Sequence, residues 1–147
     1  MADDLHVACL ACNALNRVPR HRLAEGGNCG NCKQPLAVTR PFTLSKTDFD
    51  RHIAPASPPL IVDFWADWCG PCRTMAPAFE QAAAKAAPRV RLAKLDTEAE
   101  PEIAGRFAIR SIPTLIAFVD GREVARQSGA IGLPQIMKFI ETHVPAT

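Results

Sequence analysis

The chain has 147 residues, of which 48% are hydrophobic, which suits one ordinary domain or a domain of about 105 residues with a small appendage. Its 17 basic and 15 acidic residues leave a net charge of +2, and neither 1–40 nor 41–147 has the basic excess of a nucleic-acid-binding surface. The first residues lack the pattern of a signal peptide and no apolar run could span a bilayer, so we expect a cytoplasmic protein without membrane partners.

Two Cys-x-x-Cys pairs come first in the chain. They are Cys9 with Cys12 and Cys29 with Cys32, with sixteen residues between the pairs. Thiols mostly stay reduced in the cytoplasm, so six cysteines indicate metal binding and redox catalysis more than structural disulfides. The double spacing is typical of a zinc ion held by four thiolates, which leave no open position on the metal. We therefore predict one structural zinc in a module of residues 1–38, which has too little apolar surface to fold without it.

Alternatives remain for this N-terminal segment. The four cysteines could instead form two disulfides or bind iron. His6 and His21 could replace a sulfur, but with four cysteines available we expect both at the surface. Arg17, Arg20 and Arg22, beside His21, could contact phosphate. The segment has no aromatic side chain on which bases could stack, so we expect a solvated loop and no nucleic-acid partner.

Beyond residue 38 the pattern alternates between strands and helices. Strands are expected at residues 42–44, 60–66, 90–95, 112–119 and 122–127. Helices are expected after a cap at Ser45 or Thr47, from near Cys72 to about Ala87, from Pro101, and over Leu133–Ile140. The order β-α-β-α-β-α-β-β-α predicts an α/β fold with a mixed sheet and helices on both faces.

Three details of this sheet can be predicted. The run 60–66 is apolar on both faces, as expected of a central strand that is covered on both sides. Asp120-Gly121 indicates a two-residue hairpin turn at one edge. Gly129 indicates a bulge or a close approach of another chain segment.

The third cysteine pair, Cys69 and Cys72, lies between the apolar strand and the long helix. A helix N-terminus leaves backbone N–H groups unpaired and favours thiolate over thiol, so Cys69 should be nucleophilic near neutral pH. Gly70 lets a partner's backbone come close, and Pro71 fits the first helical turn. The pattern indicates a centre for thiol–disulfide exchange.

One carboxyl group interrupts the apolar strand before this centre. Asp63 is flanked by Ile61, Val62, Phe64 and Trp65, so we expect it to be buried. Burial raises the pKa of a carboxyl group because it disfavours the charged form. Asp63 could then exchange protons with the cysteine pair near neutral pH; the alternative is a hydrogen-bonded structural carboxylate.

Three motifs together resemble thioredoxin: Val62-Asp63-Phe64-Trp65-Ala66, Trp68-Cys69-Gly70-Pro71-Cys72 and Ile112-Pro113-Thr114. The resemblance covers roughly residues 42–144. With the two cysteine pairs in front, the chain resembles the zinc-containing bacterial thioredoxin-2 type. This implies a thioredoxin fold at residues 39–147, preceded by a small zinc-ribbon-like module at residues 1–38.

The resemblance also implies roles for individual residues. Cys69 would attack a client disulfide and Cys72 would resolve the mixed disulfide. Asp63 would assist deprotonation of Cys72, with Lys94 as its charge partner. A substrate groove would be lined by Trp68, Gly70, Pro71, Ile112, a cis Pro113, Gly129 and Ala130. Ser111 and Ser128 depart from the family's usual pattern beside this groove and could change partner preference, but not the chemistry.

The implied activity is that of a protein-disulfide reductase acting on client proteins. Electrons would come from NADPH through a separate flavin enzyme, thioredoxin reductase, with no bound organic cofactor in this chain. Gly-Pro between the cysteines resembles the reducing members, which weakens an oxidase interpretation. Two alternatives concern the zinc module. It could bind nucleic acid or protein, or it could sense oxidative stress by releasing zinc when its thiolates oxidise.

Overall fold

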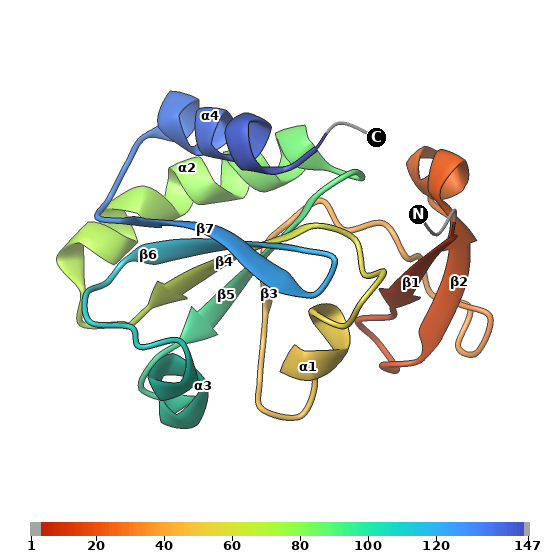
Figure 1. The fold of residues 1–147 in the computed structure, drawn as a ribbon, viewed down its shortest axis with the longest axis horizontal. Helices are drawn as coiled ribbons and strands as arrows, with labels where there is room; N and C mark the ends of the chain where they lie inside the picture. Colours follow the sequence, from red (N-terminus) through yellow and green to blue (C-terminus); the bar gives the residue numbers. More distant parts are fainter. Residues whose placement is uncertain (1–3, 146–147) are drawn as a thin grey trace.

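The computed structural model describes residues 4–145 and places a five-stranded mixed sheet between two layers of helices (Figure 1). The strands are β3 (Phe42–Thr43), β4 (Leu60–Trp65), β5 (Arg91–Asp96), β6 (Thr114–Val119) and β7 (Arg122–Ser128). Their order across the sheet is β3-β5-β4-β6-β7. Strands β3 and β4 run parallel to β5, whereas β6 is antiparallel to both β4 and β7. The predicted α/β class and element order are confirmed.

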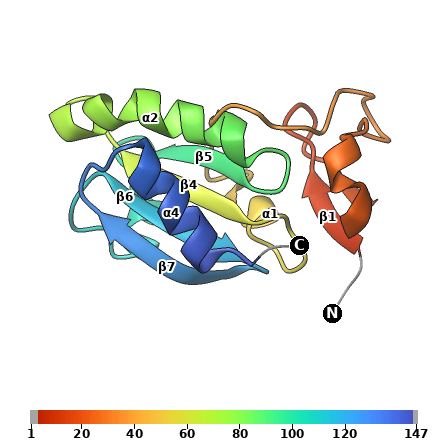
Figure 2. The same cartoon turned by 90° about the horizontal axis from the view of Figure 1, so that it is seen from above.

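The two faces of the sheet are covered by different helices (Figures 1 and 2). The helices are α1 (Phe49–His52), α2 (Gly70–Ala86), α3 (Pro101–Arg106) and α4 (Leu133–His143). Ile61 of β4 packs with α2 and α4, whereas Leu60, Val62 and Phe64 pack on the other face with residues of α1 and α3. Because side chains alternate along a strand, Asp63 points toward the α2 face, as Ile61 does.

The hairpin at the sheet edge forms as predicted. Asp120 and Gly121 both have positive φ, 52° and 82°, and they join the paired residues Val119 and Arg122. A Cβ atom on Gly121 would lie 2.8 Å from the carbonyl oxygen of Ile53, so this position requires glycine.

The bulge predicted at Gly129 is wrong. The irregularity in the pairing of β6 with β7 lies instead between Ala117 and Phe118, where the register shifts; the pairing is regular on both sides of this point. Gly129 instead has a φ of 94° just after β7, with no neighbouring atom within 4 Å of an added Cβ. The conformation that favours glycine there is local, not the result of a close approach.

The predicted caps of the first helix are also wrong. Helix α1 begins at Phe49, and neither Ser45 nor Thr47 caps it. The carboxylate of Asp48 instead accepts a hydrogen bond from the Ser45 backbone N–H at 2.8 Å. This local turn uses residues 45–48 before the helix can begin.

Residues before β3 form a small module at one end of the sheet, next to α1 (Figures 1 and 2). It contains an antiparallel pair, β1 (Asp4–Ala8) with β2 (Leu15–Pro19), and a 3₁₀ helix, η1 (Arg20–Glu25). These elements were not predicted from the sequence. Its small core comprises Leu5, Val7, Cys9, Cys29 and Leu36. No helix in the described part of the chain is long and apolar enough to cross a bilayer.

Candidate active site and metal centre

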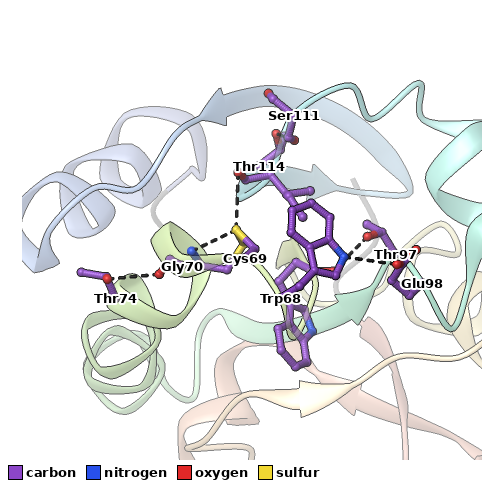
Figure 3. Close-up of a disulfide and its surroundings, with 11 residues drawn as sticks. Trp68, Cys69, Gly70, Thr74, Thr97, Glu98, Ser111 and Thr114 are labelled. Carbon is purple, nitrogen blue, oxygen red and sulfur yellow. Dashed lines mark hydrogen bonds between the residues drawn. A yellow bond between two sulfur atoms is a disulfide. The ribbon is translucent and has the colours of Figure 1, made fainter.

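The third cysteine pair lies where the central strand gives way to the longest helix (Figure 3). Helix α2 begins at Gly70, two residues before the predicted start near Cys72, because Cys69 acts as its N-cap. The Sγ atom of Cys69 accepts a hydrogen bond from the Cys72 backbone N–H at 3.2 Å. Cys69 and Cys72 are joined by a disulfide, and both are buried.

The surroundings of Cys69 favour negative charge on its sulfur. Besides the N–H of Cys72, the positive end of the α2 dipole acts on the same atom. The Ile112 carbonyl oxygen lies 3.7 Å from this sulfur and joins it to the segment that precedes β6. Cys69 is therefore the sulfur best placed to be a thiolate once the disulfide is reduced.

Asp63 is fully buried on the strand that leads to this pair, as predicted. Neither of its carboxylate oxygens has a hydrogen-bond partner among the described residues. Burial raises the pKa of Asp63 to about 7, and the charge of Lys94 opposes this rise only in part. Asp63 can therefore gain or lose a proton near neutral pH, on the face of the sheet that α2 covers.

Lys94 lies opposite Asp63 in the pairing of β4 with β5. Its ammonium group lies 4.3 Å from the centre of the Trp65 ring, a cation–π contact. No ion pair between Lys94 and Asp63 is formed in the described structure. Lys94 thus acts on Asp63 as a nearby charge, not as a hydrogen-bonding partner.

The residues predicted to line the groove lie around the disulfide, most of them at the surface, although Pro113 itself is buried. Trp68 is 69% exposed, the most exposed of the large hydrophobic side chains. The Ile112–Pro113 peptide bond is cis, as expected, and the Pro113 carbonyl accepts a hydrogen bond from the Gly129 N–H at 2.9 Å. Ala130 follows and is exposed, as are Gly70 and Pro71 at the start of α2.

The sequence analysis assigned no role to two polar residues at or beside this surface, the exposed Glu98 and the buried Thr114. Glu98 accepts a hydrogen bond from the Trp68 indole N–H at 3.1 Å, which orients the exposed ring (Figure 3). The Thr114 hydroxyl donates to the Ser111 carbonyl at 2.7 Å and lies 3.1 Å from the Ser128 hydroxyl. The two serines that depart from the family pattern are therefore joined through one threonine. A sequence signal for Thr114 was available, since it completes the motif Ile112-Pro113-Thr114.

The four remaining cysteines meet in a separate cluster. The sulfurs of Cys9, Cys12, Cys29 and Cys32 all lie within 4.8 Å of one another. The closest contacts join Cys9 to Cys32 at 3.5 Å and Cys12 to Cys29 at 3.6 Å. Tetrahedral zinc with Zn–S bonds of about 2.3 Å needs sulfurs about 3.8 Å apart, so this cluster fits the ion.

The two cysteine arms are built as equivalent turns. The backbone N–H of Cys9 donates to the Ala14 carbonyl, and the Cys9 carbonyl accepts a hydrogen bond from the Asn13 N–H. In the second arm, the N–H of Cys29 donates to the Gln34 carbonyl, and the Cys29 carbonyl accepts from the Lys33 N–H. Asn13 and Lys33 both have positive φ, 66° and 70°. Asparagine at such a position is ordinary, whereas Lys33 carries no sequence signal for it and was not predicted.

Hydrogen bonds prepare this cluster to hold thiolates. The backbone N–H of Cys32 and the side chain of Asn16 lower the pKa of Cys29 to about 6, and the side chain of Asn31 lowers that of Cys12. The backbone N–H of Gln34 also lowers the pKa of Cys32. Burial and the neighbouring sulfurs of Cys9, Cys12 and Cys29 outweigh this effect and raise the pKa of Cys32 to about 12. A cation that binds all four sulfurs would remove this competition for protons. His6 and His21 are exposed and lie outside the cluster, as predicted.

The cluster of four cysteines and the disulfide lie at opposite ends of the sheet. The disulfide follows the end of β4, whose Trp65 pairs with Asp96, whereas the module contacts the start of β5 at Arg91. Five steps of a strand at about 3.3 Å each separate these ends by about 17 Å. The two sulfur centres therefore cannot exchange thiols directly within one molecule.

Comparisons with known proteins agree with this two-part arrangement. The family model described as Thioredoxin matches residues 40–142, and the model described as the N-terminal part of Thioredoxin 2, a zinc ribbon, matches residues 8–34. The chain is 43% identical over 135 residues to Thioredoxin C-3 of Corynebacterium nephridii, covering 92% of each protein. It is 37% identical over 101 residues to the thioredoxin of Rhodospirillum rubrum, covering 69% of this chain and 97% of that protein.

A solved structure is similar as well. A mutant thioredoxin from Halobacterium salinarum NRC-1 superposes with a TM-score of 0.66 at 27% identity, covering 74% of this chain and 95% of the other. The match is consistent with a sheet and helix arrangement that continues without large insertions after the cysteine module.

Proposed function

Since the chain belongs to the thioredoxin family and is a thiol–disulfide oxidoreductase, we propose that its reaction runs through Cys69 as nucleophile and Cys72 as resolving thiol. The family acts on client proteins that contain disulfides and is reduced by thioredoxin reductase. The observation that carries the proposal is the hydrogen bond from the Cys72 N–H to the Cys69 sulfur at the start of α2.

The reaction consists of two displacements. The Cys69 thiolate attacks one sulfur of a client disulfide, forms a mixed disulfide and releases the other client sulfur as a thiolate. The Cys72 thiolate then attacks Cys69, which forms the Cys69–Cys72 disulfide and releases the second client thiolate. The client gains two electrons, and the protein is left in the oxidised form that the structure describes.

Asp63 has the proposed role of accepting the proton of Cys72 before the second displacement. Cys72 lies in the first turn of α2, and Asp63 points to the face that α2 covers. With a pKa of about 7, the carboxylate can take a proton at neutral pH and later release it. Lys94 has the proposed role of keeping this buried carboxyl from an even higher pKa.

The client would bind as an extended segment across the surface around Cys69. Gly70 and Gly129 have no atom within 4 Å of an added Cβ, so the space above both is open to a client backbone. The side chains proposed to contact the client are those of Trp68, Pro71, Ile112, Pro113 and Ala130. Ser111 and Ser128 would adjust partner preference through Thr114.

We further propose that residues 1–38 form a zinc module and residues 39–147 the catalytic domain. Cys9, Cys12, Cys29 and Cys32 would hold one structural Zn²⁺, which supplies folding free energy to the module and leaves no open coordination position. Four metal-bound thiolates are compatible with the reducing cytoplasm, where we place the protein.

The proposed electron source is NADPH, delivered by a separate flavin reductase, with no organic cofactor bound to this chain. We expect the purified protein to couple NADPH oxidation by thioredoxin reductase to insulin reduction. We also expect a potential close to that of thioredoxins, near −270 mV, in equilibration with glutathione. A potential far more oxidising than the glutathione pool would contradict the reductase direction.

Removing the metal tests whether disulfide reduction depends on the module. Treatment of the reduced protein with a strong chelator is expected to expose four further thiols to a thiol reagent. Insulin reduction should stay within about twofold, because sites this far apart usually act independently. Protein to which zinc has been restored after the chelator is removed serves as the control for chelator effects. A fall in activity in step with metal loss would instead support the oxidative-stress sensor.

Nucleic-acid binding by the module is not the function we favour. Two of its basic side chains already have acidic partners, since Arg17 lies 3.7 Å from Asp4 and Arg22 lies 3.4 Å from Glu25. Such pairs reduce the positive field that would attract phosphates.

A further inference from the structure

Arg91 is a charged residue inside the boundary between the two parts of the protein. It is the first residue of β5, it is only 5% exposed, and its backbone N–H donates to the carbonyl of Pro59, the residue just before β4. Alternation along β5 puts it on the same face as Ala93 and Leu95, the face next to α1 and the module. A guanidinium in this position needs compensating partners.

Both of its partners belong to the cysteine module. Nη1 donates to the Ala8 carbonyl and Nη2 to the Leu36 carbonyl, each at 2.9 Å. Ala8 directly precedes Cys9, and Leu36 lies four residues after Cys32. One planar group of the catalytic domain therefore holds the chain just before the first cysteine arm and just after the second.

The charges at this boundary also favour the metal-loaded cluster. Burial lowers the pKa of Arg91 to about 10, and the Cys9 thiolate acts in the opposite direction. Four thiolates around one dication carry a net charge of about −2, which would stabilise a buried cation beside them. Burial lowers the pKa of the nearby His52 to about 4, and Arg91 acts in the same direction. The imidazole therefore stays neutral and does not compete for this negative charge.

We propose that Arg91 is a positioning residue for the metal centre, through which strand β5 of the catalytic domain orients both cysteine arms and raises their affinity for zinc. The inference concerns the metal site and does not depend on the proposed roles of Cys69, Cys72 and Asp63. Groups that orient metal ligands commonly contribute about tenfold to a hundredfold to metal affinity, because they preserve the geometry of the site. By linkage, the bound metal should in turn stabilise docking of the module on β5.

The test is zinc affinity in the full chain, measured by competition with a chromophoric chelator. We expect Arg91→Met to lower the affinity by about tenfold or more. Arg89→Met is the matched control, because Arg89 lies two residues away and donates to the Pro145 carbonyl instead of the module. Its zinc affinity should equal that of the unchanged protein. Amide exchange at His6, whose N–H donates to the Ala56 carbonyl across the boundary, should rise only in Arg91→Met.

Disulfide reduction at the far end of the sheet shows independently whether each variant is folded. An active Arg91→Met variant with unchanged zinc affinity would overturn the proposal, and so would an equal loss in Arg89→Met. If Arg91→Met is inactive, Arg91→Lys takes its place, because lysine keeps the charge but cannot reproduce the planar two-bond contact. A measurable loss of zinc affinity in Arg91→Lys supports the proposal, and full affinity overturns it.

Discussion

Replacing Cys69 with serine is expected to abolish insulin reduction, with a loss of at least about a thousandfold in rate, because covalent catalysis has no substitute for its nucleophile. A serine hydroxyl at the start of α2 does not ionise near neutral pH, so the first displacement cannot begin. The measurement is the NADPH-coupled reduction rate with thioredoxin reductase. Retention of the metal in the same sample shows that the module is intact.

Cys72→Ser separates the two displacements and is the matched variant. Turnover should also be lost, but the first displacement should still occur, since Cys69 keeps its place as the N-cap of α2. A mixed disulfide between Cys69 and the client should therefore accumulate. Normal turnover in either variant would contradict the proposed roles.

Asp63→Asn is expected to stabilise the protein above pH 7. The folded-state pKa of Asp63 is about 7 against an ordinary value of 3.8, so the folded protein binds a proton at Asp63 more tightly than the unfolded chain does. The stability that protonated Asp63 contributes is therefore fully present below pH 3.8 and is lost as the pH rises through 7. A shift of this size corresponds to roughly 4 kcal/mol, an order-of-magnitude figure for the cost of burying the carboxylate.

This prediction is checked by urea unfolding of both proteins from pH 4 to pH 8.5. The difference in unfolding free energy should grow as the pH rises to about 7 and then level off. Asp67→Asn is the control, since Asp67 is exposed beside the same site and its replacement should give no such pH-dependent gain. A stability difference between wild type and Asp63→Asn that does not change with pH would refute the burial cost assigned to this carboxyl.

The same substitution should slow the second displacement. Without a carboxylate to accept the Cys72 proton, resolution of the mixed disulfide at pH 7 should fall by about tenfold to a hundredfold. Stopped-flow measurement of client release separates this step from the first displacement, which Asp63→Asn should leave nearly unchanged. The variant would then be more stable and less active, as expected where function requires an unfavourable buried charge.

Much of this arrangement can be predicted from the sequence because its signals are local. A run that is apolar except for Asp63 predicts the central strand β4, and Asp63 within that run must then be buried. The double spacing of Cys9, Cys12, Cys29 and Cys32 predicts their convergence, since each pair forms its own turn. Asp120-Gly121 predicts the hairpin because few residues accept two successive positive φ angles.

Features that depend on distant contacts could not be predicted. The strands β1 and β2 are short and are stabilised by the module's small core, so their alternation alone gives a weak signal. The cap of α2 is missed because cysteine is not an ordinary N-cap residue, although its sulfur accepts the Cys72 N–H here. The burial of Arg91 could not be predicted, because the partners that cover its guanidinium belong to the docked module.

The most direct test is to map the mixed disulfide that zinc-loaded Cys72→Ser forms with a client protein. After alkylation of the remaining thiols and proteolysis, mass spectrometry identifies which cysteine carries the client peptide. Our account predicts a single linkage, at Cys69, with the four cysteines of the metal cluster unmodified until the metal is removed. A linkage through Cys9, Cys12, Cys29 or Cys32 in the metal-loaded protein would contradict the division into one redox centre and one metal centre.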